Sequence, residues 1–412
     1  MASQGTSSMK RPRAIVIGGS LSGLFAANLL RATGWQVEVF ERARGELSGR
    51  GAGLGVQADL FAVLRRSGVR LDKSMWTELR SYTCLDQSGK TICQIPVRKV
   101  NTAWDRMYSA LKQAFPIEHY HAGMVLERVE QDERRVVAMF ANGERAEGDL
   151  LIGADGMHST VRQQFMPEIV PRYVGYVAWR GVVEESQIQP QWRAPTSDGL
   201  IFCLVDGELA LSIPMPAQDE LGHGRRRMFV WFRPAEYGST LRQWCTDATG
   251  RCHGDSIPPP LIRSEVITEI KLAARTLLAP HLAEVVACAR EPILSAIFDL
   301  EVPRMTFGRV ALVGDAAFVA RPHVGTGVTK AALDGQTLVN ALAGSEDNLA
   351  NALAAFERDR LAAGTELIAR GQRLGAHLEP APSGGGKRAP LPIENYLREY
   401  GPGDVSNLLQ DD

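Results

Sequence analysis

The sequence has little of what several classes of protein require. Its six cysteines are scattered over 412 residues, which excludes a small disulfide-stapled domain. The 46 Lys and Arg residues are offset by 47 Asp and Glu residues, so the chain lacks the basic excess of a nucleic-acid-binding protein. It also lacks an apolar run of the ~18 residues that a membrane span needs, and no apolar stretch of the signal-peptide kind follows the basic residues near its start. We therefore expect a cytoplasmic protein that binds neither nucleic acid nor membrane.

The remaining composition is that of an ordinary globular protein, and its apolar pattern changes twice along the chain. Residues 13–41 show a strand, helix, strand pattern, which is typical of a parallel α/β unit. Residues 79–95 and 115–154 predict hairpins, and residues 172–235 predict an antiparallel sheet rich in aromatic side chains. Residues 310–342 return to a buried strand followed by a helix. The pattern predicts an α/β unit interrupted by a β insertion.

A glycine-rich turn follows the first predicted strand. The sequence G-G-S-L-S-G occupies residues 18–23, before a helix, and Glu41 ends the next strand. Gly18 permits a tight turn, and Gly23 permits close packing of the helix on the strand. The helix N-terminus attracts a pyrophosphate, Glu41 can accept hydrogen bonds from ribose hydroxyls, and Ser20 replaces the usual middle glycine with another small residue. The turn predicts a bound adenine dinucleotide.

Two more predicted strands end in an aspartate. Asp155-Gly156 follows the apolar residues 150–152, and Gly314-Asp315 follows residues 310–313. Open α/β sheets bind ligands at the carboxyl ends of their strands, so three strand ends could meet on one long cofactor. A nicotinamide dehydrogenase does not need the last of the three, which argues against that class.

These residues are similar to those of a known family. With R-G-A-G at 50–53, G-A-D-G-M-H-S at 153–159 and R-P-H-V-G-T-G at 321–327, residues 12–372 resemble the class A flavin-dependent monooxygenases. Within that family, Ser20, residues 55–57 and residues 173–181 most resemble the hydroxylases of dihydroxypyridines. The resemblance implies an α/β protein of the para-hydroxybenzoate hydroxylase fold. Its Rossmann-like FAD-binding domain would comprise residues 1–77, 101–170 and 286–372, with an inserted antiparallel substrate domain at 78–100 and 171–285 and a tail at 373–412.

The resemblance also implies a chemistry. FAD would take electrons from NADH or NADPH and react with O2, and a flavin C4a-hydroperoxide would hydroxylate an electron-rich ring, of which a hydroxypyridine is the first expectation. A phenol or another heteroaromatic is the alternative, as is a flavin-binding protein without turnover. We expect a small aromatic molecule as partner and a homodimer as the assembly. The implied FAD-binding residues are Gly18, Ser20, Leu21, Ser22, Gly23, Glu41, Arg42, Arg50, Gly51, Asp155, Gly156, Gly314, Asp315, Gly325, Thr326 and Gly327.

His323 is the expected catalytic residue. It lies between Pro322 and the glycines that open the next helix, and an imidazole with an ordinary pKa near ~6.5 can accept a proton from a ring hydroxyl at neutral pH. The alternative is a histidine that only contacts the flavin. Pro322, His323 and Tyr176 are the expected substrate-side residues.

Three polar features lie outside this assignment. Asp105 stands where many relatives carry an arginine that contacts the flavin, so the residue on that side is open. Residues 225–227 are three consecutive arginines, which we interpret as a solvated loop, with an anion site as the alternative. For His119 and His121, two apart on a predicted strand, we expect no carboxylate or cysteine companion and therefore no metal site.

Overall fold

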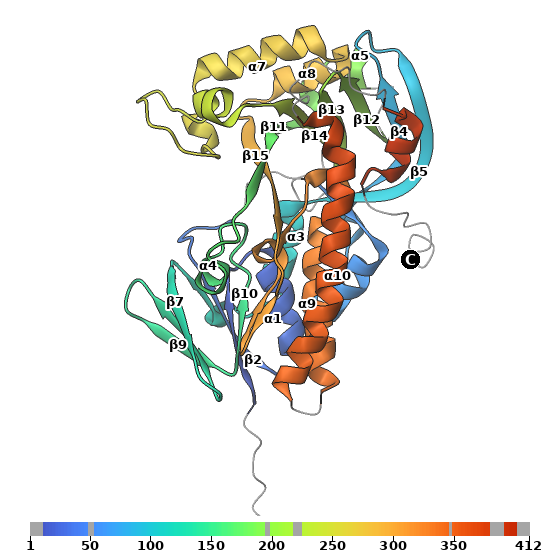
Figure 1. Ribbon diagram of the computed structural model, residues 1–412. Helices are drawn as coiled ribbons and strands as arrows, with labels where there is room; N and C mark the ends of the chain where they lie inside the picture. The colour runs from blue at the N-terminus through green and yellow to red at the C-terminus, as the bar shows by residue number, and fades with distance from the viewer. Residues whose placement is uncertain are drawn as a thin grey trace, which may run out of the picture.

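The computed structural model describes residues 11–47, 53–193, 198–216, 225–345, 348–379 and 391–401. These residues form two large sheets and one small sheet, with helices between and around them (Figure 1). Among the described helices, none has the length and apolarity needed to cross a membrane.

The first large sheet is parallel except at one edge. Its order is β16 (Thr306–Phe307), β17 (Val310–Leu312), β10 (Leu150–Gly153), β1 (Arg13–Ile17), β2 (Gln36–Glu41) and β6 (Tyr120–Ala122), and only β16 and β17 pair antiparallel. Its central strands are almost continuously apolar because both faces of the sheet are covered. Helices α1 (Leu21–Ala32) and α9 (Gly327–Ala343) lie on one side, and the small sheet of β7 (Leu126–Gln131), β8 (Val136–Phe140) and β9 (Arg145–Gly148) lies on the other (Figure 1).

The second large sheet has nine strands. Its order is β18 (Phe318–Val319), β15 (Ile293–Glu301), β11 (Arg172–Glu184), β14 (Arg226–Pro234), β13 (Glu208–Met215), β12 (Gly199–Val205), β4 (Trp76–Leu85), β5 (Thr91–Ala103) and β3 (Gly53–Val56). The sheet is antiparallel, as predicted, except that β12 and β4 pair parallel. The β4–β5 hairpin enters from a distant part of the chain, so no short turn fixes its direction relative to β12.

The two faces of this sheet have different partners. Helices α7 (Ser264–Leu277) and α8 (Pro280–Cys288) cover the face that carries Val177 and Trp179 (Figure 1). The opposite face carries Tyr176 and Ala178 and packs against Val324, which belongs to the half of the molecule that contains the parallel sheet. The expected alternation of β11 side chains between two faces is confirmed.

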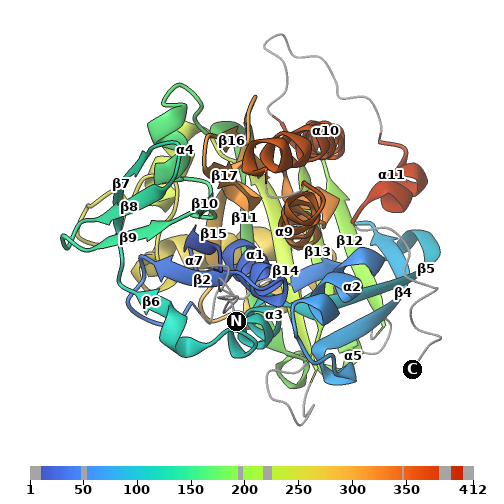
Figure 2. The same cartoon turned by 90° about the horizontal axis from the view of Figure 1, so that it is seen from below.

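The segment expected to be a tail contains ordered structure. Helix α10 (Leu349–Gly375) passes residue 372, and α11 (Ile393–Glu399) lies beside β5 (Figure 2). Tyr396 and Tyr400 are buried in the same apolar cluster as Tyr82 and Phe202, which explains why this segment docks. The flexible linker expected at 380–392 falls almost wholly outside the described residues. The remaining helices are α2 (Ala58–Arg66), α3 (Trp104–Gln113), α4 (Thr160–Phe165), α5 (Pro190–Arg193) and α6 (Arg242–Trp244).

The domain boundaries stay a prediction. Strand β15, which pairs with β11 in the nine-stranded sheet, lies beyond the boundary expected at residue 285. The nine-stranded sheet therefore includes strands outside the expected segments 78–100 and 171–285, such as β15 and β3.

Candidate cofactor and active site

The three strand ends meet at one edge of the parallel sheet. The Ala154 amide donates to the Ile17 carbonyl at 2.8 Å, which joins the ends of β10 and β1. A Cβ atom added to Gly18 would lie 2.3 Å from the Ala154 oxygen, and one added to Gly314 would lie 2.0 Å from Ser22 Oγ. These contacts leave no room between the turns for larger residues. The turns at residues 18–23, 154–156 and 314–316 therefore form one continuous surface.

The first turn has the shape needed by a phosphate group. Gly18 adopts a φ of +104°, and a Cβ atom at Gly23 would lie 1.8 Å from the Gly18 oxygen, so both positions require glycine. Ser20 is the N-terminal capping residue of α1, yet its side chain makes no capping hydrogen bond. Its hydroxyl and the first amides of α1 are available to an anion.

Glu41 supports this turn. Its carboxylate is 7% exposed and accepts hydrogen bonds from the Gly19 amide at 2.8 Å and the Ala43 amide at 2.9 Å. Each carboxylate oxygen can accept a second hydrogen bond. Glu41 thus fixes the backbone beside it and retains capacity for a ribose hydroxyl, while the neighbouring Arg42 is exposed.

The two aspartates at the other strand ends have different surroundings. Asp155 accepts hydrogen bonds from Ser159 Oγ at 2.5 Å and the Val161 amide at 3.2 Å. Burial raises the pKa of Asp155, and these hydrogen bonds oppose that effect. The Asp315 side chain is 61% exposed and has Lys330 Nζ at 3.8 Å. Asp155 therefore shapes its turn, whereas Asp315 presents free acceptor oxygens.

Arg162 is a residue for which the sequence analysis found no role. It is fully buried in α4 and donates to the carbonyls of Met157 at 2.6 Å, Ala316 at 3.0 Å and Ile169 at 3.3 Å. The first two carbonyls belong to the turns after β10 and β17. Arg162 therefore ties two of the three turns together. In the sequence, the only indication was a basic residue at the end of the motif at 153–162.

A second buried group holds the Gly314 turn. Lys330 Nζ donates to the carbonyls of Gly314 at 2.6 Å and Phe318 at 2.5 Å. Asp334 accepts from the Gly314 amide at 2.8 Å and from Arg360 Nε at 2.7 Å. Burial lowers the pKa of Lys330, and the nearby Asp334 opposes this. Both polar backbone atoms of Gly314 are thus fixed by charged side chains of one helix, α9.

The N-terminus of α9 has unused hydrogen-bonding groups. Gly325 has a left-handed φ of +62°, the helix begins at Gly327, and no side chain caps it. Thr326 and Thr329 are 5% and 1% exposed, and their hydroxyls have no partner among the described residues. No atom would lie within 4 Å of a Cβ added to Gly327. Unpaired buried hydroxyls, a positive helix end and open space beside a glycine fit the acceptor-rich edge of a flavin.

His323 is enclosed rather than open to a cavity. It is 0% exposed, its Nε2 lies 2.9 Å from Tyr176 Oη, and its ring packs at 4.5 Å from that of Phe232. Nδ1 has no hydrogen-bond partner in the described part of the chain. Burial, together with His377 and Arg321, lowers the pKa of His323 well below 6.5, so the ring is neutral at neutral pH. The neighbouring Pro322 is the exposed member of this turn.

The interpretation of residues 225–227 as a solvated loop is wrong for two of its three arginines. Arg226 and Arg227 begin β14 and are 5% and 0% exposed. Arg227 Nε donates to Glu185 at 2.8 Å, and Arg226 lies 3.6 Å from Asp105. Pairing of β14 with β11 buries the two side chains on opposite faces of the sheet, which a charge run alone does not indicate. Asp105, in α3, therefore faces a cation from the nine-stranded sheet.

The reasoning about His119 and His121 also needs correction. Glu38 from β2 lies 2.9 Å from His119 Nδ1 and 2.7 Å from His121 Nε2, so a carboxylate is present after all. It comes from the neighbouring parallel strand and is distant in sequence. Within the described ranges, no group of three or more His, Cys, Asp or Glu side chains could hold a metal ion. The predicted residues Arg50 and Gly51 lie outside the described residues.

Comparisons with known proteins agree with this geometry. A family model described as FAD binding domain-like matches residues 173–299. The chain is 32% identical over 373 residues to 2,6-dihydroxypyridine 3-monooxygenase of Paenarthrobacter nicotinovorans, covering 89% of this chain and 91% of that protein. It is 26% identical to 6-hydroxynicotinate 3-monooxygenase of Pseudomonas fluorescens, over 80% and 82% of the two chains.

Solved structures share the architecture. The structure of 2,6-dihydroxypyridine-3-hydroxylase from Arthrobacter nicotinovorans superposes with a TM-score of 0.86 at 30% identity, covering 96% of this chain and 97% of that one. Klebsiella pneumoniae HpxO complexed with FAD and uric acid has the same fold, with a TM-score of 0.71 at 24% identity over 88% and 87% of the chains. The predicted fold class and the FAD cofactor are confirmed. The chain, with its three strand ends meeting under a nine-stranded sheet, belongs to the class A flavin-dependent monooxygenases and is an FAD-dependent aromatic hydroxylase.

Proposed function

We propose that the protein hydroxylates a hydroxypyridine, with NADH or NADPH as electron donor and O2 as co-substrate. Two of the relatives above are named for hydroxylated pyridines, and the one with 32% identity is matched over nearly its whole length. A phenol is the second candidate, because salicylate hydroxylase of Pseudomonas putida is 28% identical over 83% of this chain. The observation that carries the proposal is the meeting of three strand ends opposite an apolar sheet face.

The residues that would hold FAD follow from the unused polar groups. Ser20 and the first turn of α1 would bind the pyrophosphate, and Asp315 would accept hydrogen bonds from the ribityl hydroxyls. Thr326, Thr329 and the open N-terminus of α9 would meet the polar edge of the flavin ring. When bound, FAD supplies the redox chemistry and the activation of O2. The chain itself supplies binding, orientation and a dry surface.

The nine-stranded sheet would exclude water from the reacting ring. Its inner face carries Leu209, Leu211, Val230 and Phe232, all buried. An apolar wall strengthens every electrostatic interaction beside it and prevents side reactions with water. This face is therefore suited to a small planar aromatic substrate.

His323 is the proposed proton acceptor, in contact with Tyr176. The ring is uncharged at neutral pH and so carries one lone pair, although burial beside Arg321 makes the imidazolium unfavourable. Because the side chain is fully buried and Nε2 contacts Tyr176, substrate binding would have to open this contact. A base of low pKa matches a substrate whose hydroxyl is itself acidic. The ring nitrogen of a hydroxypyridine withdraws electrons and makes its hydroxyls acidic, which favours that class over simple phenols.

The test is a screen of hydroxypyridines and phenols for stimulated NADH or NADPH oxidation in air, followed by mass analysis of the product. We expect a dihydroxypyridine to stimulate oxidation and to gain one oxygen atom. FAD-free protein is the control for non-enzymatic oxidation. Stimulation by phenols alone, or oxidation without an oxygenated product, would contradict the proposal.

A further inference from the structure

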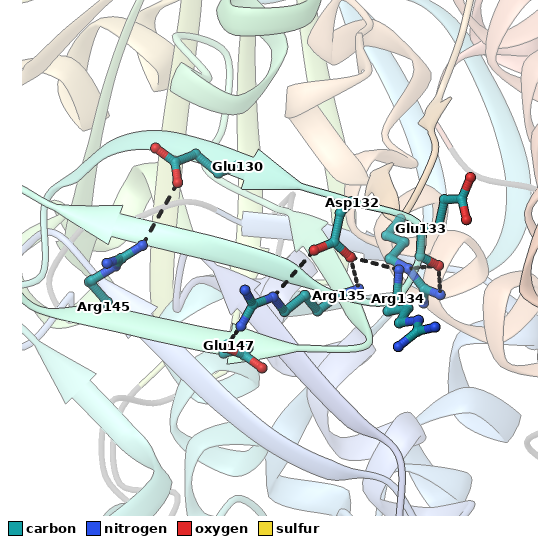
Figure 3. A network of polar contacts seen from close by, with 8 residues as sticks. Glu130, Asp132, Glu133, Arg134, Arg135, Arg145 and Glu147 are labelled. Carbon is teal, nitrogen blue, oxygen red and sulfur yellow. Dashed lines mark hydrogen bonds and ion pairs between the residues drawn. The ribbon is translucent and has the colours of Figure 1, made fainter.

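Arg180 on β11 differs in its hydrogen bonding from the arginines with which it can be compared. Buried Arg162 donates to three carbonyls, Arg227 pairs with Glu185, and Arg321 pairs with Asp299. Even the exposed Arg135 on the small sheet binds Asp132 and Glu147 (Figure 3). Arg180, in contrast, forms no hydrogen bond or ion pair with the described residues, and its Nε is buried without a partner.

The position of Arg180 on the sheet shows which way its side chain points. Gly181 faces α8, because a Cβ atom there would lie 3.1 Å from Ala289 Cβ. Its neighbour Arg180 must face the other way, together with Tyr176, Ala178 and Val182. This is the inner face, which packs against the half of the molecule that carries the cofactor turns.

The residues beside Arg180 on that face are apolar. Val230 lies directly across from it on β14, and Leu211 lies next to Val230 on β13. Arg226, another buried cation of this face, already has Asp105 as its partner. Burial lowers the pKa of Arg180, and no carboxylate opposes that effect. The guanidinium nevertheless stays charged, because arginine does not lose its proton in proteins.

An unpaired cation in an apolar wall is unfavourable by itself and strongly favours an anion from outside the chain. Residue Arg180 is only partly buried, so its terminal nitrogens, which have no partner among the described residues, remain accessible. The planar fork of a guanidinium can bind two oxygen atoms at once. Arg180 lies four positions after Tyr176, a span of about 13 Å along the strand. An arginine side chain and a single aromatic ring can together cover that span.

We propose that Arg180 binds the anionic group of the aromatic substrate, either a deprotonated ring oxygen or a ring carboxylate. This inference deepens the proposed function and rests on it. Binding the anion would orient the ring against the sheet, and for a ring oxygen it would keep that oxygen deprotonated, so that the ring stays rich in electrons. The same contact would select against neutral aromatic molecules of equal size.

The test measures ligand binding to the FAD-loaded protein without NADH or NADPH, and the change in the flavin spectrum reports the binding. The ligands are 2,6-dihydroxypyridine, 6-hydroxynicotinate and the neutral molecule pyridine. We expect Arg180→Met to raise the Kd of the anions by about 10- to 100-fold, the loss of one charged hydrogen bond or more, and that of pyridine by less than about 3-fold. Arg180→Lys should recover part of the affinity. Arg80→Met is the matched control, since Arg80 is an exposed arginine of the same sheet.

The choice of ligands distinguishes a ring oxygen from a ring carboxylate as the bound anion. It also distinguishes failure of the Arg180 assignment from failure of the proposed function. Loss confined to 6-hydroxynicotinate identifies a carboxylate site, whereas loss for both anions identifies a site for ring oxygens. If wild-type protein binds these anions through Arg180 but oxygenates neither, the proposed function fails and the assignment of Arg180 stands. Equal weakening of pyridine, unchanged anion binding, or an effect only on FAD content or on the KM for NADH or NADPH would overturn the assignment. Should Arg180→Met not fold, the lysine variant decides. A raised Kd for the anions with an unchanged Kd for pyridine supports the assignment, whereas unchanged affinity for all three ligands, or equal losses for all three, refutes it.

Discussion

Replacing Arg162 by Met should damage both the fold and the cofactor site. The change removes three hydrogen bonds and leaves the carbonyls of Met157, Ala316 and Ile169 unpaired in a buried region. The bond to Ile169 is long at 3.3 Å, so we count two strong bonds, each to a charged donor. At about 1.5 kcal/mol per bond, the free energy of unfolding should fall by about 3 kcal/mol. Because the first two carbonyls belong to the cofactor turns, the Kd for FAD should also rise by about 10-fold or more.

The assay compares urea unfolding of the FAD-free protein with FAD binding measured by quenching of flavin fluorescence. Arg227→Met is the matched control, since Arg227 is equally buried but belongs to the nine-stranded sheet, where it pairs with Glu185. We expect Arg227→Met to lower stability without changing the Kd for FAD beyond that loss. If Arg162→Met unfolds within about 1 kcal/mol of the wild type and binds FAD normally, the reasoning that Arg162 holds the turns together is refuted.

Three further predictions concern single side chains. Burial lowers the pKa of His281 from 6.5 to about 4, so the unfolded chain binds this proton at a higher pH than the folded protein does. The free energy of unfolding should therefore fall by about 3 kcal/mol as the pH drops from about 6.5 to about 4. Urea unfolding measured across that range should show a weaker pH dependence of this free energy for His281→Gln, and an unchanged pH dependence would count against the assignment. Gly23→Ala should yield a colourless protein, because its Cβ would lie 1.8 Å from a backbone oxygen, whereas Gly45→Ala, with no atom within 4 Å, should keep its flavin absorbance; a yellow Gly23→Ala protein would contradict this. His323→Gln, which can still bond Tyr176, should lower kcat at least about 10-fold with FAD content unchanged if His323 accepts a proton, and equal turnover would leave it a packing residue.

The cofactor turns were predictable from the sequence because their signals are local. A glycine such as Gly18, which has a positive φ, or Gly23, where a Cβ has no room, marks a turn within a few residues of its own strand. The aspartates at 155 and 315 are recognisable because each directly follows a buried apolar run. That these strand ends lie side by side also follows, since parallel strands present their carboxyl ends to one edge.

The environment of the charged residues was not predictable in this way. Arg226 and Arg227 lie in a run of charge that normally marks a solvated loop, yet strand pairing buries both. The neutral state of His323 results from its burial, together with His377 and Arg321. That burial involves Tyr176, 147 residues away in sequence, and Tyr400 of the C-terminal segment. The ordinary pKa of His323, from which the sequence argument started, therefore does not apply inside the fold.

The sequence by itself determined where the backbone turns tightly and which strands are buried, because glycine conformation and apolar periodicity act over a few residues. Only the tertiary structure decided which charged groups find partners, since pairing depends on strands and helices that meet from distant parts of the chain. Arg162 acquires three carbonyls in this way, whereas Arg180 acquires no partner in the part of the chain that the structure describes. That difference, which no local pattern encodes, assigns one arginine to hold the site together and leaves the other free to bind a ligand.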